Sequence, residues 1–193
     1  CASLVCQQPY AQALTCTVRP KTLTAWLQAS SKHEYFLMAI EDLYREVIMD
    51  HYKRPRNKGP NLEANVVVEG VNPLCGDEIK LWLTINNEKT VTAASFEGQG
   101  CSISQASVSI MTEAIIGECL ENVKTIISSF RAMMLEGSEP DEKLLGDGIA
   151  LEGVRQFPVR IKCAVLSWNT LNLGIDQHAT AGDQRVELKH SES

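Results

Sequence analysis

Three cysteines and one aspartate stand at positions from which they could together bind a metal ion. Cys75 and Asp77 are two residues apart with Gly76 between them, so both side chains can lean toward one centre. Cys101 follows a Gly-rich turn at the predicted start of a helix, and Cys163 lies on a later predicted helix. Three thiolates and one carboxylate suit tetrahedral Zn²⁺, or an Fe–S cluster with one exchangeable oxygen ligand.

The surroundings of two of these cysteines favour the thiolate form. At the start of a helix, unpaired N–H groups and the helix dipole stabilise an anion, and this applies to Cys101. Arg160 lies three residues before Cys163 and therefore on the same helical face. The carboxylate is the informative ligand, because a purely structural zinc site more often uses a fourth cysteine or a histidine. An exchangeable Asp77 can leave and open a position for another ligand.

Free, metal-binding or reactive thiols are expected rather than disulfides. The sequence has seven cysteines, an odd number spread through 193 residues, a length that can bury a core without disulfides. Cys119 is expected to be an ordinary buried or half-buried residue. From the residues alone, plain burial also remains an alternative for Cys75, Cys101 and Cys163, since free cysteine is among the most buried residue types.

The elements that must position these side chains follow from the hydrophobic periodicity. Apolar residues recur at the helical period in four segments: 41–54, 102–117, 120–135 and 158–173. Three further segments are strand candidates: 66–69, 79–85 and 90–96. Asn86-Asn87 predicts a hairpin turn between the second and third of these strands. A helix, then a meander of strands, then further helices predicts an α+β fold.

One domain is predicted, spanning 38–176. Residues 1–37 contain three strong bases and no acid before Glu34, and their apolar spacing fits neither helix nor strand. We expect this segment to be disordered or a non-native extension, with Met38 as the native start, and import into an organelle through 1–37 is the less favoured alternative. Residues 177–193 turn polar and are expected to form a frayed tail.

Charge and hydropathy argue against two kinds of partner. Eighteen Lys and Arg against 24 Asp and Glu give a formal net charge of −6, which disfavours binding to nucleic acid or to an anionic membrane. No stretch approaches the ~18 consecutive apolar residues that a spanning helix needs, and the N-terminal residues lack the profile of a secretory signal. We therefore expect a cytoplasmic protein.

Four segments carry a resemblance to one known family. They are 43–57 (LYREVIMDHYKRPRN), 72–77 (NPLCGD), 96–107 (FEGQGCSISQAS) and 157–168 (FPVRIKCAVLSW). In this order they resemble the NifU N-terminal/IscU-like scaffold family of iron–sulfur cluster assembly. Lys162 directly precedes Cys163, and Arg160 stands three residues before it. These positions, and the 62 residues from Cys101 to Cys163, resemble the SufU branch of that family.

The resemblance implies a fold, a site and a partner. The implied fold is a small antiparallel three-stranded sheet packed against about five helices. The implied metal ligands for Zn²⁺ are Cys75, Asp77, Cys101 and Cys163. Cys75 would accept sulfur from the persulfide of a SufS-type, PLP-dependent cysteine desulfurase, and Arg160 would keep the freed or persulfidated sulfur anionic. Sulfur would then pass to downstream Fe–S assembly proteins or apo-proteins, so the implied activity is sulfurtransferase-like rather than that of a self-contained enzyme.

The resemblance also points to partner contacts and leaves two other functions open. Tyr44, Arg45 and Arg56 recur in the family's N-terminal segment and are expected to contact the desulfurase. Iron or a [2Fe–2S] cluster on the same ligands is the alternative to zinc, and the protein would then be a scaffold on which a cluster is assembled and transferred. A function of another class is a non-catalytic interaction module stapled by zinc.

Overall fold

A helix at 42–53 opens the described part of the chain. The structure, a computed structural model, describes residues 42–181 and 186–191, so the predictions for 1–37 lie outside it. The helix ends before Pro55, as predicted, because proline disfavours helical geometry in the residue that precedes it. His51 on this helix is buried, whereas Leu43 and Tyr52 are exposed.

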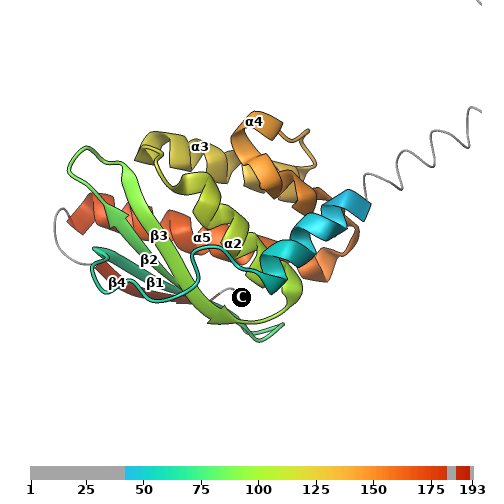
Figure 1. Cartoon of the computed structure of the whole chain (residues 1–193), viewed down its shortest axis with the longest axis horizontal. Helices are drawn as coiled ribbons and strands as arrows, with labels where there is room; N and C mark the ends of the chain where they lie inside the picture. The colour runs from blue at the N-terminus through green and yellow to red at the C-terminus, as the bar shows by residue number, and fades with distance from the viewer. Residues whose placement is uncertain (1–41, 182–185, 192–193) are drawn as a thin grey trace, which may run out of the picture. The chain divides into compact units, whose positions relative to one another are not determined.

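Four strands form one sheet in the order β3-β2-β1-β4 (Figure 1). The predicted antiparallel meander is present, and its strands are β1 (Val66–Asn72), β2 (Asp77–Ile85) and β3 (Val91–Gln99). The side-chain oxygen of Asn86 accepts hydrogen bonds from the N–H groups of Glu88 and Thr90 in the turn between β2 and β3. This asparagine therefore closes the predicted hairpin.

The fourth strand corrects the predictions of a three-stranded sheet and of a frayed tail after residue 176. α5 (Pro158–Ala181) continues past the predicted end of the domain, and β4 (Val186–Ser191) pairs in parallel with β1. An edge strand has a single neighbour and leaves alternate side chains in solvent, so a polar sequence can form one. The polar composition of this segment therefore gave no strand signal.

Removal of residues 182–193 is expected to lower the free energy of unfolding by about 1–3 kcal/mol. The truncation takes away the parallel ladder along β1, whose backbone hydrogen bonds contribute about 1 kcal/mol each net, and this loss is partly offset because the residues of β4 no longer have to be ordered. Denaturant unfolding measures the loss, and amide exchange should accelerate in β1. As a control, Lys189→Ala removes an exposed side chain and keeps the ladder, so it should cost less than about 0.5 kcal/mol. Unchanged exchange in β1 after truncation would contradict the pairing.

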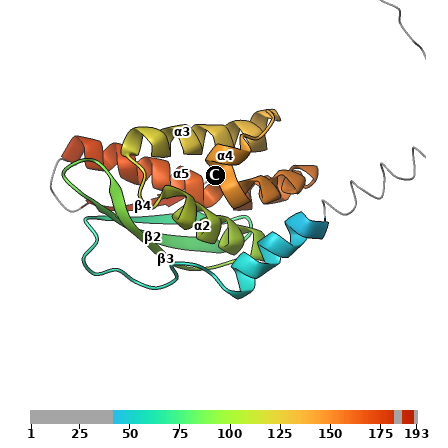
Figure 2. The ribbon, with the colours of Figure 1, turned by 45° about the horizontal axis from the view of Figure 1, so that its top comes forward.

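The helices cover one face of the sheet (Figure 2). α2 (Ser102–Ile115) packs on β3, and α5 packs on β1 and on α2. Three further helical elements follow α2: α3 (Leu120–Arg131) with a π-helical continuation (Ala132–Glu136), α4 (Glu142–Leu145), and a 3₁₀ segment (Gly146–Gln156). α3 and α4 lie on the side of α2 and α5 that faces away from the sheet. The α+β prediction and the prediction of about five helices are confirmed.

Aromatic stacking joins the two helical layers. The rings of Phe130 on α3 and Trp168 on α5 are stacked with centroids 4.1 Å apart. Both side chains are fully buried, and the indole N–H of Trp168 donates to Ser107 Oγ on α2. A buried indole needs such a partner. The hydrogen bond of Trp168 fixes α5, which carries Cys163, against α2, which begins directly after Cys101.

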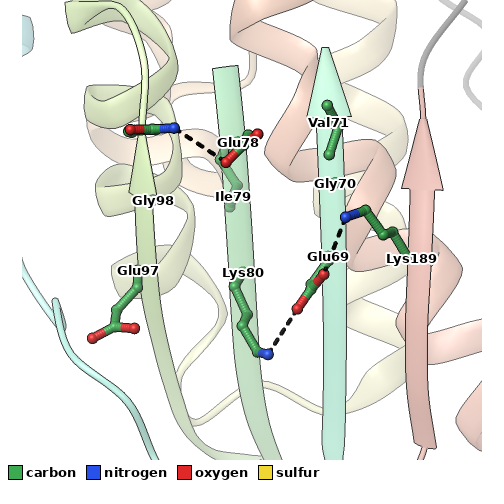
Figure 3. Close-up of a pocket in the computed structure, with 10 residues that line it drawn as sticks. Glu69, Gly70, Val71, Glu78, Ile79, Lys80, Glu97, Gly98 and Lys189 are labelled. Carbon is green, nitrogen blue, oxygen red and sulfur yellow. Dashed lines mark hydrogen bonds and ion pairs between the residues drawn. The ribbon is translucent and has the colours of Figure 1, made fainter. Parts of the chain in front are cut away.

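The opposite face of the sheet carries a row of alternating charges (Figure 3). Lys80 lies between Glu97 and Glu69 in the strand register, and Lys189 follows on β4. Lys80 Nζ donates to Glu69 at 2.7 Å, and this hydrogen bond lowers the pKa of Glu69. The row borders a hollow of about 400 Å³. This hollow lies on the other side of the sheet from the helices.

Candidate metal centre

A tight hairpin presents Cys75. Asn72 at the end of β1 pairs with Asp77 at the start of β2, so residues 73–76 form the connection. The carbonyl of Asn72 accepts the N–H groups of Cys75 and Gly76 at 3.3 and 2.9 Å. Gly76 has φ +69°, a left-handed conformation that favours glycine. Leu74 at the tip is 68% exposed and Cys75 is half-buried, so this thiol is held close to solvent.

Cys101 is the N-cap of α2, as the Gly-rich turn before the helix predicts. Its Sγ accepts the N–H of Ser104 at 3.4 Å, which satisfies one of the free donors at the start of the helix. Its own N–H donates to Asp77 Oδ1 at 2.8 Å. The backbone of Cys101 is therefore joined to the aspartate, while its thiol lies in the positive end of the helix dipole.

Cys163 is the buried cysteine among the predicted ligands. It lies near the start of α5, and it is fully buried. Burial raises the pKa of this thiol, and the neighbouring Asp77 and Cys75 side chains add to the shift. The side-chain amide of Asn72 donates to Cys163 Sγ at 3.8 Å. Because it is buried, Cys163 is less accessible than Cys75 and Cys101, which are half-buried.

The structure brings three of the four predicted ligands together. Single ligand atoms of Cys75, Asp77 and Cys163 all lie within 4.8 Å of one another. Asp77 is fully buried, and its Oδ2 has no hydrogen-bond partner. A buried carboxylate oxygen without a donor is costly, and a cation would satisfy it. The donor set therefore fits a metal ion. Cys101 lies beside this group, bonded to Asp77 through its N–H rather than grouped through its sulfur.

Arg160 stands at the exposed rim of this cluster, on the first turn of α5. The charges of the neighbouring cysteines raise its pKa, Cys101 most of all, and a hydrogen bond to Cys163 contributes. The guanidinium is therefore charged at the rim of the cluster. The role of Arg160 toward an anionic sulfur stays a prediction.

The three predicted partner contacts fall into two different environments. Tyr44 and Arg45 line a groove of about 320 Å³ that also contains Ser102 and Phe157. Arg56 instead makes ion pairs within the chain, at 2.6 Å to Asp50 and 3.6 Å to Glu113. The Arg56 pairing lowers the pKa of Asp50.

A second polar cluster has the composition of a hydrolase triad but lacks an accessible nucleophile. His51 Nδ1 lies 2.9 Å from Ser109 Oγ, and Nε2 lies 3.2 Å from Asp147 Oδ2. Ser109 is fully buried, and its hydroxyl oxygen accepts the N–H of Arg56. Because a serine nucleophile must reach its substrate, this cluster instead ties the helix at 42–53 to α2 and to the 3₁₀ segment.

Two residues that hold the ligands were missed in the sequence. Asn72 contacts Cys163, and the hydroxyl of Ser104 donates to Asp77 Oδ1 at 3.1 Å. Asn72 starts the segment that contains Cys75 and Asp77, so its place next to the ligands was a usable signal. Ser104 gave none, because its bond to Asp77 joins residues 27 positions apart.

The α+β fold with a cysteine–aspartate cluster at one end of the sheet defines a small domain with a candidate metal site. Residues 43–177 match the family model of the NifU-like N-terminal domain, and the chain belongs to this family. None of the helices within 42–181 has the length and apolar character that crossing a bilayer requires.

Relatives of two kinds are similar to this chain. The zinc-dependent sulfurtransferase SufU of Bacillus subtilis is 50% identical over 137 residues, which cover 70% of this chain and 91% of that protein. The iron–sulfur cluster assembly scaffold protein IscU of Streptococcus pyogenes is 39% identical over 154 residues, covering 78% of this chain and 96% of that protein. The resemblance to the SufU branch is thus supported by a named relative.

Solved structures agree on the fold. A putative iron–sulfur cluster assembly scaffold protein for the SUF system from Fervidobacterium islandicum has a TM-score of 0.61 and 38% identity, covering 67% of this chain and 94% of that chain. The N-terminal part of a NifU-like protein from Brucella abortus has a TM-score of 0.67, covering 73% of this chain and 97% of that chain. At 23% identity, the second likeness concerns the fold alone.

Proposed function

We propose that this protein is a zinc-bound sulfur acceptor. It takes sulfur from a SufS-type, PLP-dependent cysteine desulfurase and passes it to downstream Fe–S assembly proteins or apo-proteins. The observation that carries the proposal is the position of Cys75, which lies on an exposed hairpin and within 4.8 Å of a buried cysteine and a buried carboxylate. The similarity to a zinc-dependent sulfurtransferase supports the same function.

Four side chains would hold the metal: Cys75, Asp77, Cys101 and Cys163. The unpartnered Oδ2 of Asp77 supplies the oxygen ligand, and three thiols with one carboxylate are a donor set suited to Zn²⁺. Bound zinc would keep its cysteine ligands deprotonated. Zinc itself would not take part in a redox reaction.

Cys75 is the sulfur acceptor in this proposal because it lies on the exposed hairpin and no N–H group of the described residues donates to its sulfur. Cys163 is fully buried, and the Sγ of Cys101 is engaged by the Ser104 N–H. Cys75 is half-buried between the exposed Leu74 and Gly76. A partner's persulfide can therefore approach it from the hairpin side.

The transfer is a displacement of the same type as thiol–disulfide exchange. The Cys75 thiolate attacks the outer sulfur of the partner's persulfide, and a new S–S bond forms on Cys75. The S–S bond within the partner's persulfide breaks, and the partner's cysteine leaves as a thiolate. No external oxidant or reductant is needed. Arg160, charged and at the rim, stabilises the persulfide anion that forms on Cys75.

Tyr44 and Arg45 are the proposed contacts for the desulfurase. They line a groove that reaches Ser102, the residue after Cys101, so a partner seated there would lie beside the cluster. Arg56 is a weaker candidate, because its guanidinium is already paired with Asp50 and Glu113.

Assembly of a [2Fe–2S] cluster on the same four residues is the second candidate. The similarity to IscU scaffold proteins favours it. Metal analysis of the purified protein and anaerobic reconstitution separate the two functions. The proposal expects stoichiometric zinc and faster desulfurase turnover in its presence. A stable cluster with visible absorption, on protein that does not stimulate the desulfurase, would refute the acceptor function. Bound zinc without any response of a desulfurase would indicate the zinc-stapled interaction module instead.

A further inference from the structure

The hydroxyl group of Ser104 lies at the centre of the contacts that fix Asp77. Ser104 is fully buried on the first turn of α2, and its Oγ donates to Asp77 Oδ1 at 3.1 Å. The same oxygen also lies 3.1 Å from the carbonyl of Cys101. A hydroxyl group has one hydrogen, and an ionised carboxylate is the stronger acceptor. When Asp77 is charged, the hydroxyl hydrogen therefore points at Oδ1.

Oδ1 of Asp77 is fully used by protein donors. It accepts the Ser104 hydroxyl and, at 2.8 Å, the N–H of Cys101. Gly100 makes room for this arrangement, since a Cβ at this position would overlap Oδ1 and crowd the Ser104 hydroxyl. The second oxygen of Asp77, Oδ2, is buried and has no hydrogen-bond partner.

The hydroxyl of Ser104 is not needed for the helix cap. The cap is formed by the N–H of Ser104, which donates to Cys101 Sγ, and a substitution of the side chain keeps that bond. The start of α2 thus depends on the N–H of Ser104, and the position of the Asp77 carboxylate depends on its hydroxyl group. This separation makes the role of the side chain testable without removal of the cap.

We propose that Ser104 is a positioning residue that makes Asp77 a one-oxygen ligand. By holding Oδ1 together with the Cys101 N–H, it leaves Oδ2 as the single oxygen that Asp77 can offer to a metal. A metal ion held by the three cysteine sulfurs and this one oxygen would be four-coordinate, whereas a released carboxylate could offer both oxygens or turn away. The inference rests on the metal site of the proposed function and adds what determines its coordination number.

Co²⁺ is the probe for this inference, because its visible absorption is intense in four-coordinate sites and weaker in five-coordinate ones. Ser104→Ala should weaken Co²⁺ and Zn²⁺ binding about 10-fold, the effect of an outer-shell partner, and should reduce the visible Co²⁺ absorption. Ser104→Thr keeps the hydroxyl and should restore both. Ser109→Ala is the matched control, since Ser109 is another buried serine on α2 whose hydroxyl contacts His51 and accepts the N–H of Arg56 instead. It should lower thermal stability and leave the Co²⁺ spectrum unchanged.

The outcomes separate this inference from the proposed function. If the original protein takes up neither Zn²⁺ nor Co²⁺, the proposed metal site fails. If it binds Co²⁺ and Ser104→Ala gives the same spectrum and affinity, the positioning role is overturned. An equal spectral change in Ser109→Ala overturns it as well, because the effect would then be general to α2. Should Ser104→Ala not fold, Gly100→Ala places a Cβ against both Asp77 Oδ1 and the Ser104 hydroxyl and so disturbs the same contact, and an unchanged spectrum there overturns the role.

Discussion

Replacement of Cys75 by alanine is expected to abolish the stimulation of the cysteine desulfurase and to leave the partner's basal turnover unchanged. Cys75 is the half-buried thiol on the exposed hairpin, and the buried Cys163 cannot take its place. Sulfide release by the desulfurase, followed under reducing conditions with and without the variant, measures the effect. Far-UV circular dichroism should show an unchanged fold, since residues 73–76 form only a turn.

Cys119→Ala is the matched control for this experiment. Like Cys75, Cys119 is a half-buried free cysteine. It lies at the N-cap of α3, where its side chain makes no capping hydrogen bond, and it is outside the cluster. Full stimulation is expected from this variant. Stimulation by Cys75→Ala equal to that of the unmodified protein would refute the assignment of Cys75 as acceptor.

Asp77→Asn is expected to remove metal binding and to spare the metal-free fold. Oδ1 accepts two hydrogens, so the carbonyl oxygen of an asparagine must occupy that position and its NH₂ must replace Oδ2. An NH₂ group offers no ligand to a metal, and zinc affinity should fall by more than about 100-fold, beyond the loss typical of an outer-shell partner. The metal-free variant should be at least as stable as the metal-free original, because a buried carboxylate with an unsatisfied oxygen disappears.

Denaturant unfolding with and without zinc tests both halves of this prediction. At a zinc concentration about 1,000 times Kd, the original protein should gain about 4 kcal/mol in free energy of unfolding, and the variant should gain far less. Glu78→Gln is the control, since Glu78 neighbours Asp77 on β2 but is exposed. It should keep the zinc-dependent gain. An equal zinc-dependent gain in Asp77→Asn would exclude Asp77 as a ligand.

Local sequence signals account for much of the fold. Pro55 predicts the end of the first helix, Asn86 predicts the hairpin, and Pro158 predicts the start of α5, each through a backbone preference of its own residue. The N-cap position of Cys101 also follows from local sequence, since a Gly-rich turn changes into a helical pattern there. These features need no knowledge of distant residues.

The features that the sequence did not predict depend on long-range pairing. β4 is stabilised by β1, which lies more than 100 residues earlier in the chain, and its own polar sequence gives no sign of this. His51 is buried because Ser109 and Asp147 meet its two ring nitrogens, although a histidine near the end of a helix is usually exposed. In the candidate site, residue type and family motif identified Cys75, Asp77 and Cys163 as ligands. They did not show how the carboxylate of Asp77 is held. The saturation of Oδ1 by α2 became visible only in three dimensions.

The most direct test of the account is to locate the transferred sulfur. The zinc-loaded protein is mixed with a SufS-type desulfurase and cysteine for a single turnover, the free thiols are alkylated, and peptides are mapped by mass spectrometry. The account predicts one additional sulfur atom on the peptide that contains Cys75 and none on those with Cys101, Cys119 or Cys163. Sulfur found first on another cysteine, or on none, would contradict the account.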